Sequence, residues 1–200
     1  ETDEDIIGIA KTAQKIVDLY YSMPDKPKGK SVTVNISVAC FVPKPFTPFQ
    51  FDAQNTKELL EEKQKLLLSS VRSKKISVSY HDAETSRLEA MLARGDRRLG
   101  RVIEGAWKRG SRLDGWDEHF KPSAWHDALL DEGLKLSFYA HRTRSYDEVF
   151  PWDHLDYGVT KEYLIAEHRR ALSTVTTPDC RNACFGCGAD RLTGGVCPCR

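Results

Sequence analysis

The sequence of 200 residues predicts a mixed α/β fold, and two observations lead to this class. Near the amino terminus, a helical pattern, an alternating strand pattern, a proline-rich turn and a second helical pattern follow one another, which is the order of an α/β unit. From residue 76 to residue 175 helical patterns predominate, after one short strand pattern. A chain of this length has room for one domain and a small appendage.

The first helical pattern covers residues 1–23. Thr2 or Asp3 can cap it, and the acidic side chains of the first turn face the positive end of the helix dipole. Nothing in the sequence before this helix covers its apolar face, so we expect the chain to be part of a longer protein. The apolar residues recur at helical spacing and predict one buried stripe: Ile6, Ile9, Ala10, Ala13, Ile16, Val17 and Tyr20.

Residues 31–41, SVTVNISVACF, alternate as a strand does. One row holds Val32, Val34, Ile36, Val38 and Cys40, and suits packing beneath helices. The other row is small and polar apart from its end, and it suits the interior of a barrel or a ligand cleft. An antiparallel strand with one side in water explains that row equally well. Its members are Thr33, Asn35, Ser37, Ala39 and Phe41.

The segment FVPKPFTPF follows this strand and predicts a rigid turn, since proline fixes φ and removes a backbone donor. That role alone accounts for Pro43, Pro45 and Pro48. A helix is expected over residues 55–71, a short strand over 74–82, and a long helical pattern over 83–109 that breaks at GDRRLG. Two further helices are expected to be capped by Ser123 and Thr160.

The composition excludes several classes of function. The 30 Lys and Arg residues balance 29 Asp and Glu residues, so no net field favours nucleic acid or an acidic membrane surface. No apolar run approaches the roughly 20 residues of a membrane span, and no signal peptide pattern is present. We therefore expect a cytoplasmic protein. Gly-rich phosphate loops, serine nucleophile elbows and HExxH helices are all missing from the sequence.

Five of the six cysteines fall in the last 21 residues, which favours one local metal site over a distributed disulfide framework. The glycines between them let the backbone wrap closely around an ion or cluster. A fourth ligand from the last two cysteines would complete a zinc or a 4Fe-4S site. A terminus that is merely rich in cysteine is the alternative. The candidate ligands are Cys180, Cys184, Cys187, Cys197 and Cys199.

A resemblance to a known family rests on an ordered set of blocks. These are ETDED, FVPKPFTPFQF, ISVSYHDAETSRLEAMLARGDRRLG, AWKRGSRLDGWDEHF, FPWDHLDYGV and TTPDC. Over essentially the whole chain, they resemble the C-terminal part of a poorly characterised radical S-adenosylmethionine (SAM) family whose members carry an N-terminal cobalamin-binding domain. The resemblance implies the C-terminal part of a partial (β/α) barrel over 1–75, a mainly helical extension over 76–175 and a cysteine-rich metal-binding tail over 176–200.

In barrels of this type the chemistry lies at the carboxyl ends of the strands. The resemblance therefore implies that SAM and an unknown substrate lie close to Glu1, Thr2, Ser37, Ala39 and Phe41. It implies that the full-length protein uses a 4Fe-4S cluster and SAM to generate a 5'-deoxyadenosyl radical. An upstream barrel and a cobalamin-binding domain are the expected partners within the same protein, and whether cobalamin takes part stays open.

The spacing of Cys180, Cys184 and Cys187 is that of a SAM-cleaving cluster, but its position in the chain is wrong. Only 13 residues follow Cys187, whereas the barrel of such an enzyme follows its cysteine loop. We therefore expect the SAM-cluster cysteines upstream of Glu1, an inactive chain when it is isolated, and an auxiliary iron-sulfur cluster or zinc in the tail. A non-catalytic zinc-knuckle binding module is the alternative function.

Polar residues of the extension could also form a site, although histidines beside aromatic residues more often serve packing, and arginines more often pair with neighbouring acids. The loop of residues 153–157 is the best candidate for an acid/base or phosphate site. It lies between Pro151 and Gly158, where polar residues are not needed to make a helix or strand. The candidates are His81, Asp82, Asp96, Arg97, Arg98, His119, His141, Asp153, His154, Asp156 and Tyr157.

Overall fold

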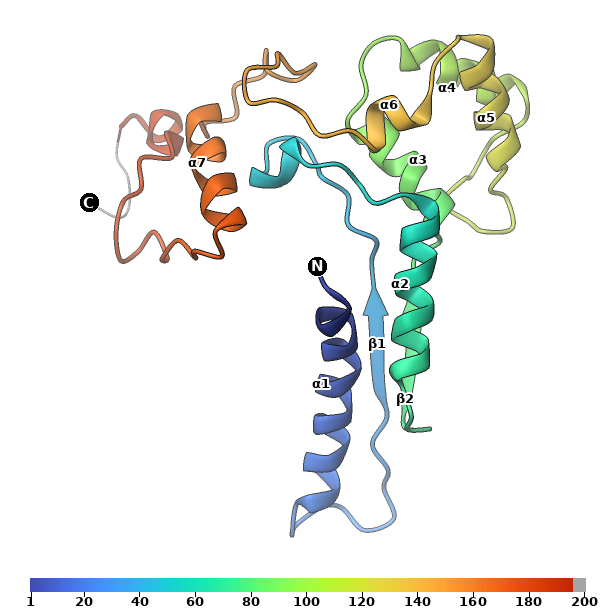
Figure 1. Cartoon of the computed structure of the whole chain (residues 1–200), viewed down its shortest axis with the longest axis vertical. Coiled ribbons are helices and arrows are strands. Elements are labelled where there is room, and N and C mark those ends of the chain that lie inside the picture. Colours follow the sequence, from blue (N-terminus) through green and yellow to red (C-terminus); the bar gives the residue numbers. More distant parts are fainter. Residues whose placement is uncertain (196–200) are drawn as a thin grey trace. The chain divides into compact units, whose positions relative to one another are not determined.

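The computed structural model describes residues 1–195 (Figure 1). These residues form a mixed α/β fold, made mostly of helices with one two-stranded parallel sheet, so the predicted class is confirmed. They form no barrel. The chain divides into two compact units: Glu1–Phe41 with Asn55–Arg87, and Val42–Gln54 with the chain from Leu88 onward. None of the helices in the described residues combines the length and the apolar character that crossing a bilayer requires.

The first unit is built from helix α1 (Asp3–Ser22), strand β1 (Val34–Val38), helix α2 (Lys57–Ser70) and strand β2 (Ile76–Tyr80). The two strands are parallel, in a register that runs from Val34 opposite Ile76 to Val38 opposite Tyr80. Parallel neighbours need a crossover connection, and α2 is part of it. The strand pattern at 74–82, which we expected to open the extension, therefore belongs to the first unit.

Helix α1 begins as the sequence predicts. The Thr2 backbone N–H donates to Asp5 Oδ2 over 2.7 Å, and the Asp5 N–H donates to Thr2 Oγ1 over 3.3 Å, which is a capping box. The Asp5 carboxylate accepts hydrogen bonds from the Thr2 backbone N–H and from the Thr2 hydroxyl, and these two bonds lower the pKa of the carboxyl, the backbone bond more strongly. Most of the predicted stripe is buried, whereas Ile16 is 48% exposed.

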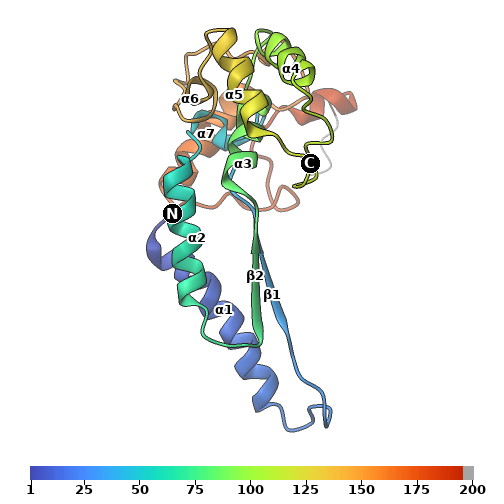
Figure 2. The same ribbon diagram turned by 90° about the vertical axis from the view of Figure 1, so that its right-hand side faces the viewer.

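The sheet of the first unit has one covered face and one exposed face. Helices α1 and α2 both lie on the same side of the strands (Figure 2), where Ile36 and Ile76 join the apolar core of this unit. On the other face the Ser77 hydroxyl donates to Asn35 Oδ1 over 2.6 Å. The apolar row is thus confirmed from Val32 to Val38, and the antiparallel alternative is wrong because β1 pairs in parallel. The polar side chains Asn35, Ser37, Ser77 and Ser79 are on the exposed or half-exposed face.

Helices dominate the remainder of the chain. The break at GDRRLG is confirmed, as is the cap at Thr160, whose hydroxyl accepts from the Tyr163 N–H. The expected cap at Ser123 is wrong, because the helix already begins at Pro122 and proline favours the first helical position. The elements are α3 (Ala83–Ala93), α4 (Leu99–Lys108), α5 (Pro122–Asp131), α6 (Leu136–Ala140), α7 (Lys161–Leu172), and the 3-10 turns η1 (Pro48–Phe51) and η2 (Ala189–Thr193).

The second unit contains two apolar clusters. The larger one is formed mainly by α3 to α6, and the smaller one joins Phe51 of η1 to Leu164 of α7. The fully buried Arg94 side chain donates to the Asp52 and Arg142 carbonyl oxygens, and the Arg144 guanidinium donates to the Arg94 carbonyl over 2.9 Å. Burial, and after it repulsion from the other two guanidiniums, lowers the pKa of Arg94 to about 10.

Candidate functional sites

The first candidate site is a small hollow of the first unit at the carboxyl ends of β1 and β2, which we call the strand-end pocket. Its volume is about 80 Å³. Because the strands are parallel, the residues that follow both of them lie at the same edge of the sheet. The amino end of α1 lies at this edge as well. The lining includes Glu1, Ala39, Cys40, Phe41, Lys63 and Tyr80.

Three of the five residues expected near SAM line the strand-end pocket: Glu1, Ala39 and Phe41. The other two have different positions. The Thr2 hydroxyl is part of the cap of α1, where it bonds to Asp5. Ser37 lies on the exposed face of β1 and is not part of the lining.

The pocket also contains polar residues that the sequence analysis missed. Lys63 Nζ donates to Glu1 Oε2 over 2.5 Å. The Gln64 side-chain amide donates to the His81 carbonyl over 2.9 Å and approaches Cys40 Sγ at 3.6 Å. We had assigned Cys40 to the apolar row, but the strand ends at Val38, so the alternation stops before it. Its position directly after a strand was the signal.

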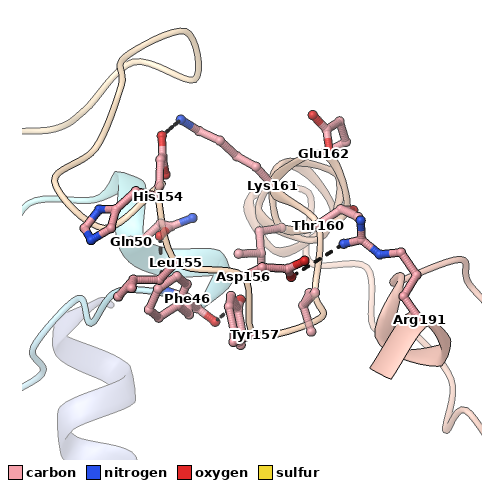
Figure 3. Close-up of a pocket in the computed structure, with 13 residues that line it drawn as sticks. Phe46, Gln50, His154, Leu155, Asp156, Tyr157, Thr160, Lys161, Glu162 and Arg191 are labelled. Atoms are coloured by element: carbon pink, nitrogen blue, oxygen red, sulfur yellow. Dashed lines mark hydrogen bonds and ion pairs between the residues drawn. The ribbon is translucent and has the colours of Figure 1, made fainter. Parts of the chain in front are cut away.

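The second candidate site is a hollow of about 370 Å³ in the second unit, which we call the loop pocket (Figure 3). The loop of residues 153–157 forms one wall, and the start of α7 forms another. Phe46 and Gln50 come from the proline-rich turn and η1, and Arg191 comes from η2. The structure thus brings together three segments that are far apart in the sequence: residues 46–50, residues 153–164 and η2.

Most polar groups of this loop already have partners that fix its shape. Asp153 Oδ2 accepts from the Phe150 N–H over 2.9 Å and from Lys161 Nζ over 2.6 Å. Asp156 Oδ1 accepts from the Gly158 N–H over 2.9 Å and lies 3.8 Å from the Arg191 guanidinium, as Figure 3 shows. These carboxylates therefore hold the loop in its conformation.

Phe46 is the strained residue of the loop pocket. Its φ is 60°, which is uncommon for a residue with a bulky side chain. Its N–H donates to Gln50 Oε1 over 3.0 Å, and its carbonyl accepts from the Tyr157 hydroxyl over 3.0 Å. The two aromatic rings pack with centroids 4.0 Å apart, and burial raises the pKa of Tyr157. The proline-rich turn therefore does more than reverse the chain, because it also supplies a wall of this pocket.

The cysteine tail is described as far as Gly195, so Cys197 and Cys199 lie outside the described residues. The Cys187 carbonyl accepts from the Thr160 N–H over 2.9 Å, which joins the tail to the start of α7. Burial, then Glu167 and Cys187, and to a smaller extent Cys180, raise the pKa of Tyr163. Both thiols therefore lie within electrostatic range of one tyrosine. Within residues 1–195 no three His, Cys, Asp or Glu side chains form a group that could hold a metal ion.

The histidines have different environments. His119 is exposed, and His141 Nδ1 lies 3.1 Å from the Gln54 carbonyl. His168 is buried, with Nδ1 2.8 Å from the Tyr146 hydroxyl and Nε2 3.1 Å from Asp52 Oδ2. The sequence carries no signal for these two partners of His168, since one precedes it by 22 residues and the other by 116.

Comparisons of the chain with protein-family models, with curated proteins and with solved structures found no match. The resemblance to a radical SAM family therefore stays a prediction.

Proposed function

We propose that this chain is the C-terminal part of a radical SAM enzyme and contributes the last α/β units of a partial (β/α) barrel. One observation carries the proposal. The first unit is a parallel β1–α2–β2 arrangement, and its pocket lies at the carboxyl ends of the strands, where barrels of this type have their chemistry. That pocket is lined by Glu1, Ala39 and Phe41, three of the residues that the resemblance implies.

The size of the strand-end pocket agrees with a shared site. Ligand sites usually measure roughly 300–1,000 Å³, and this pocket measures about 80 Å³. SAM would need further walls, which an upstream barrel would supply. The exposed polar face of the sheet, with Asn35 and Ser37, is suited to the interior of that barrel.

In the full-length protein, SAM together with a reduced 4Fe-4S cluster would supply a 5'-deoxyadenosyl radical that abstracts hydrogen from an unknown substrate. The cysteines that hold this cluster would lie upstream of Glu1. In this chain, Ala39 and Phe41 would contact SAM or the substrate, and Lys63 would hold the Glu1 carboxylate in position. We assign the protein to the cytoplasm because its cysteines gather in one tail.

The enzyme proposal is tested by anaerobic assays with SAM and dithionite. We expect the natural longer protein to form 5'-deoxyadenosine, and residues 1–200 alone, reconstituted with iron and sulfide, to form none above background. Cysteine-dependent production by residues 1–200 alone would show that the tail itself holds the SAM-cleaving cluster. No production by the longer protein would overturn the proposal.

The tail is proposed to hold an auxiliary iron-sulfur cluster or a zinc ion through Cys180, Cys184 and Cys187, with Cys197 or Cys199 as fourth ligand. Three thiols at this spacing are suitable donors for either. Metal binding would also order a segment that is too small to bury a core of its own.

Elemental analysis of protein prepared without air tests the tail. About four iron and four sulfide per chain would indicate a cluster, and about one zinc would indicate a knuckle. Cys184→Ser should abolish stoichiometric metal, whereas Cys40→Ser, which changes the cysteine outside the tail, should retain it. Metal only at trace level in folded protein would refute the proposed metal site.

A non-catalytic zinc-knuckle module is the second candidate. The bond between Thr160 and Cys187 favours it, because it joins the tail to a unit that has packed cores of its own. Zinc in the tail, together with a longer protein that forms no 5'-deoxyadenosine, would favour this module over the enzyme.

A further inference from the structure

A second hollow of the second unit, which shares His154 with the loop pocket, has the properties of an anion site. Its volume is about 680 Å³, and we call it the Arg97–His154 hollow. One side is formed by the segment between α3 and α4, and the other by residues 149–154. Arg97 and His154, which lie 57 residues apart in the sequence, therefore line the same hollow. The lining is Asp96, Arg97, Arg98, Phe150, Pro151 and His154, with Gly95 and Val149.

Arg97 and His154 are available for a ligand. Both side chains are exposed, and within residues 1–195 neither makes a hydrogen bond or an ion pair. Arg98 differs, because its Nη2 lies 2.7 Å from Asp96 Oδ2 and its guanidinium lies over the Phe138 ring. The hydrogen bond from Arg98 lowers the pKa of Asp96, so this carboxylate stays ionised, and the ion pair with Arg98 balances its charge. The hollow thus presents one unpaired guanidinium and one unpaired imidazole.

Positive charge close to the hollow, in part buried, adds to its attraction for anions. The guanidiniums of Arg94, Arg142 and Arg144 lie together with the carboxylates of Asp52 and Glu148, and Arg144 also lies within electrostatic range of Asp96, which pairs with Arg98. Arg144 lies 5.5 Å from the centroid of the Phe150 ring, and Phe150 lines the hollow. Solvent and salt screen charges in such surroundings less than charges at the surface. The local excess of positive charge therefore extends to the hollow.

The backbone of α4 indicates which groups would bind the anion. The first N–H groups of this helix are already used: Leu99 donates to the Asp96 carbonyl over 3.0 Å, and Gly100 donates to the Arg97 carbonyl over 3.1 Å. Binding would therefore depend on side chains. A guanidinium fork matches the geometry of a phosphate group, and an imidazole can add a donor. Phe150 and Pro151 give the hollow an apolar wall beside these donors.

We propose that the Arg97–His154 hollow binds the phosphoryl group of a small phosphate monoester, with Arg97 and His154 as the donors and the apolar wall next to the organic part. This proposal does not depend on the radical chemistry. It is tested by NMR titration of the 200-residue chain with inorganic phosphate and with phenyl phosphate, followed through the Arg97 side-chain N–H and His154 ring signals. The two probes separate the sources: equal affinities would indicate free phosphate as ligand, and tighter binding of phenyl phosphate would indicate an organic ester.

Matched variants test whether phosphate binds at Arg97 and His154. Arg97→Ala and His154→Ala should each weaken phosphate binding by about tenfold, the effect of losing one charge-assisted hydrogen bond. Both positions are exposed, so the thermal unfolding midpoint should stay close to that of the original chain. Arg101→Ala removes the same charge from α4 at a side chain that is 79% exposed and outside the hollow, and it should leave affinity unchanged. Saturable binding that survives both substitutions, or no saturable binding by the folded chain, would overturn the proposal.

Discussion

The two units differ in how completely they bury their apolar residues. The core of the second unit has members without any exposed surface, namely Ala90, Met91, Val102, Ala106 and Ala140. In the first unit every core residue keeps between 3% and 9% of its surface exposed, and a whole face of the sheet is polar and exposed. The two parallel strands have helices on one face only, whereas parallel sheets are normally covered on both faces. In the barrel that we propose, further polypeptide would cover this second face.

The largest effect is expected from a charge on the covered face of β1. Ile36→Asp would place an unpaired carboxylate in the core of the first unit and should lower the free energy of unfolding by about 4 kcal/mol. Ser37→Asp, one residue along on the exposed face, should change it by less than about 0.5 kcal/mol. Urea unfolding followed by circular dichroism measures both. Similar effects of the two variants would contradict the two-faced sheet.

A smaller but still large effect is expected in the second unit at Arg94. Arg94→Met leaves the carbonyls of Asp52 and Arg142 without their buried donor and should cost about 3 kcal/mol. Arg97→Met, three residues along and exposed, should be nearly neutral. Tryptophan fluorescence during urea unfolding reports on this unit. A mild effect of Arg94→Met would mean that the buried arginine does not hold the unit together.

The pH dependence of the second unit should depend in part on Glu148. The hydrogen bonds from Arg142, of 2.8 and 2.6 Å, lower the pKa of this carboxyl below its ordinary value of 4.5. The carboxylate therefore stabilises the fold above that pH, and the contribution is lost as the pH falls through the lowered pKa. Glu148→Gln should be less stable than the original chain at neutral pH and equally stable at strongly acidic pH. Asp147→Asn is the control, and a difference that persists in acid would contradict this assignment.

The smallest effect concerns two helix caps of the same kind, one in each unit. Thr56→Ala and Thr160→Ala each remove a hydroxyl that accepts from the third residue of a helix, and each should cost about 1 kcal/mol. Thr160 also packs against Gly188 of the tail. We therefore expect limited proteolysis to cut the tail faster in Thr160→Ala only. Equal cutting rates would mean that the side chain of Thr160 does not hold the tail.

Local features of the fold could be predicted from the sequence, and non-local ones could not. The caps at Thr2 and Thr160 and the apolar row of β1 follow from neighbouring residues, and all three are confirmed. Ser123 failed as a cap because Pro122, one residue earlier, starts the helix. Two non-local features depend on packing between distant segments: β2 pairs with β1, and Arg97 and His154 line one hollow. The residue pattern within a single segment cannot predict which distant segment packs against it.

The same distinction applies to the candidate site. The strand alternation placed Ser37 and Ala39 on one row, but only Ala39 lines the strand-end pocket, because the chain leaves the strand after Val38. Lys63 reaches the pocket from α2, and nothing in its own helical pattern distinguished it from the other lysines of that helix. The ends of strands are thus better guides to a site than the row on which a residue falls.

The most direct test of the central claim, that the first unit completes a radical SAM barrel, is to determine the coding sequence immediately upstream of Glu1. We predict an open reading frame that continues upstream and encodes further α/β units, preceded by a cysteine triad of C-x3-C-x2-C spacing. A start codon directly before Glu1, or an upstream reading frame without such a triad, would contradict the account.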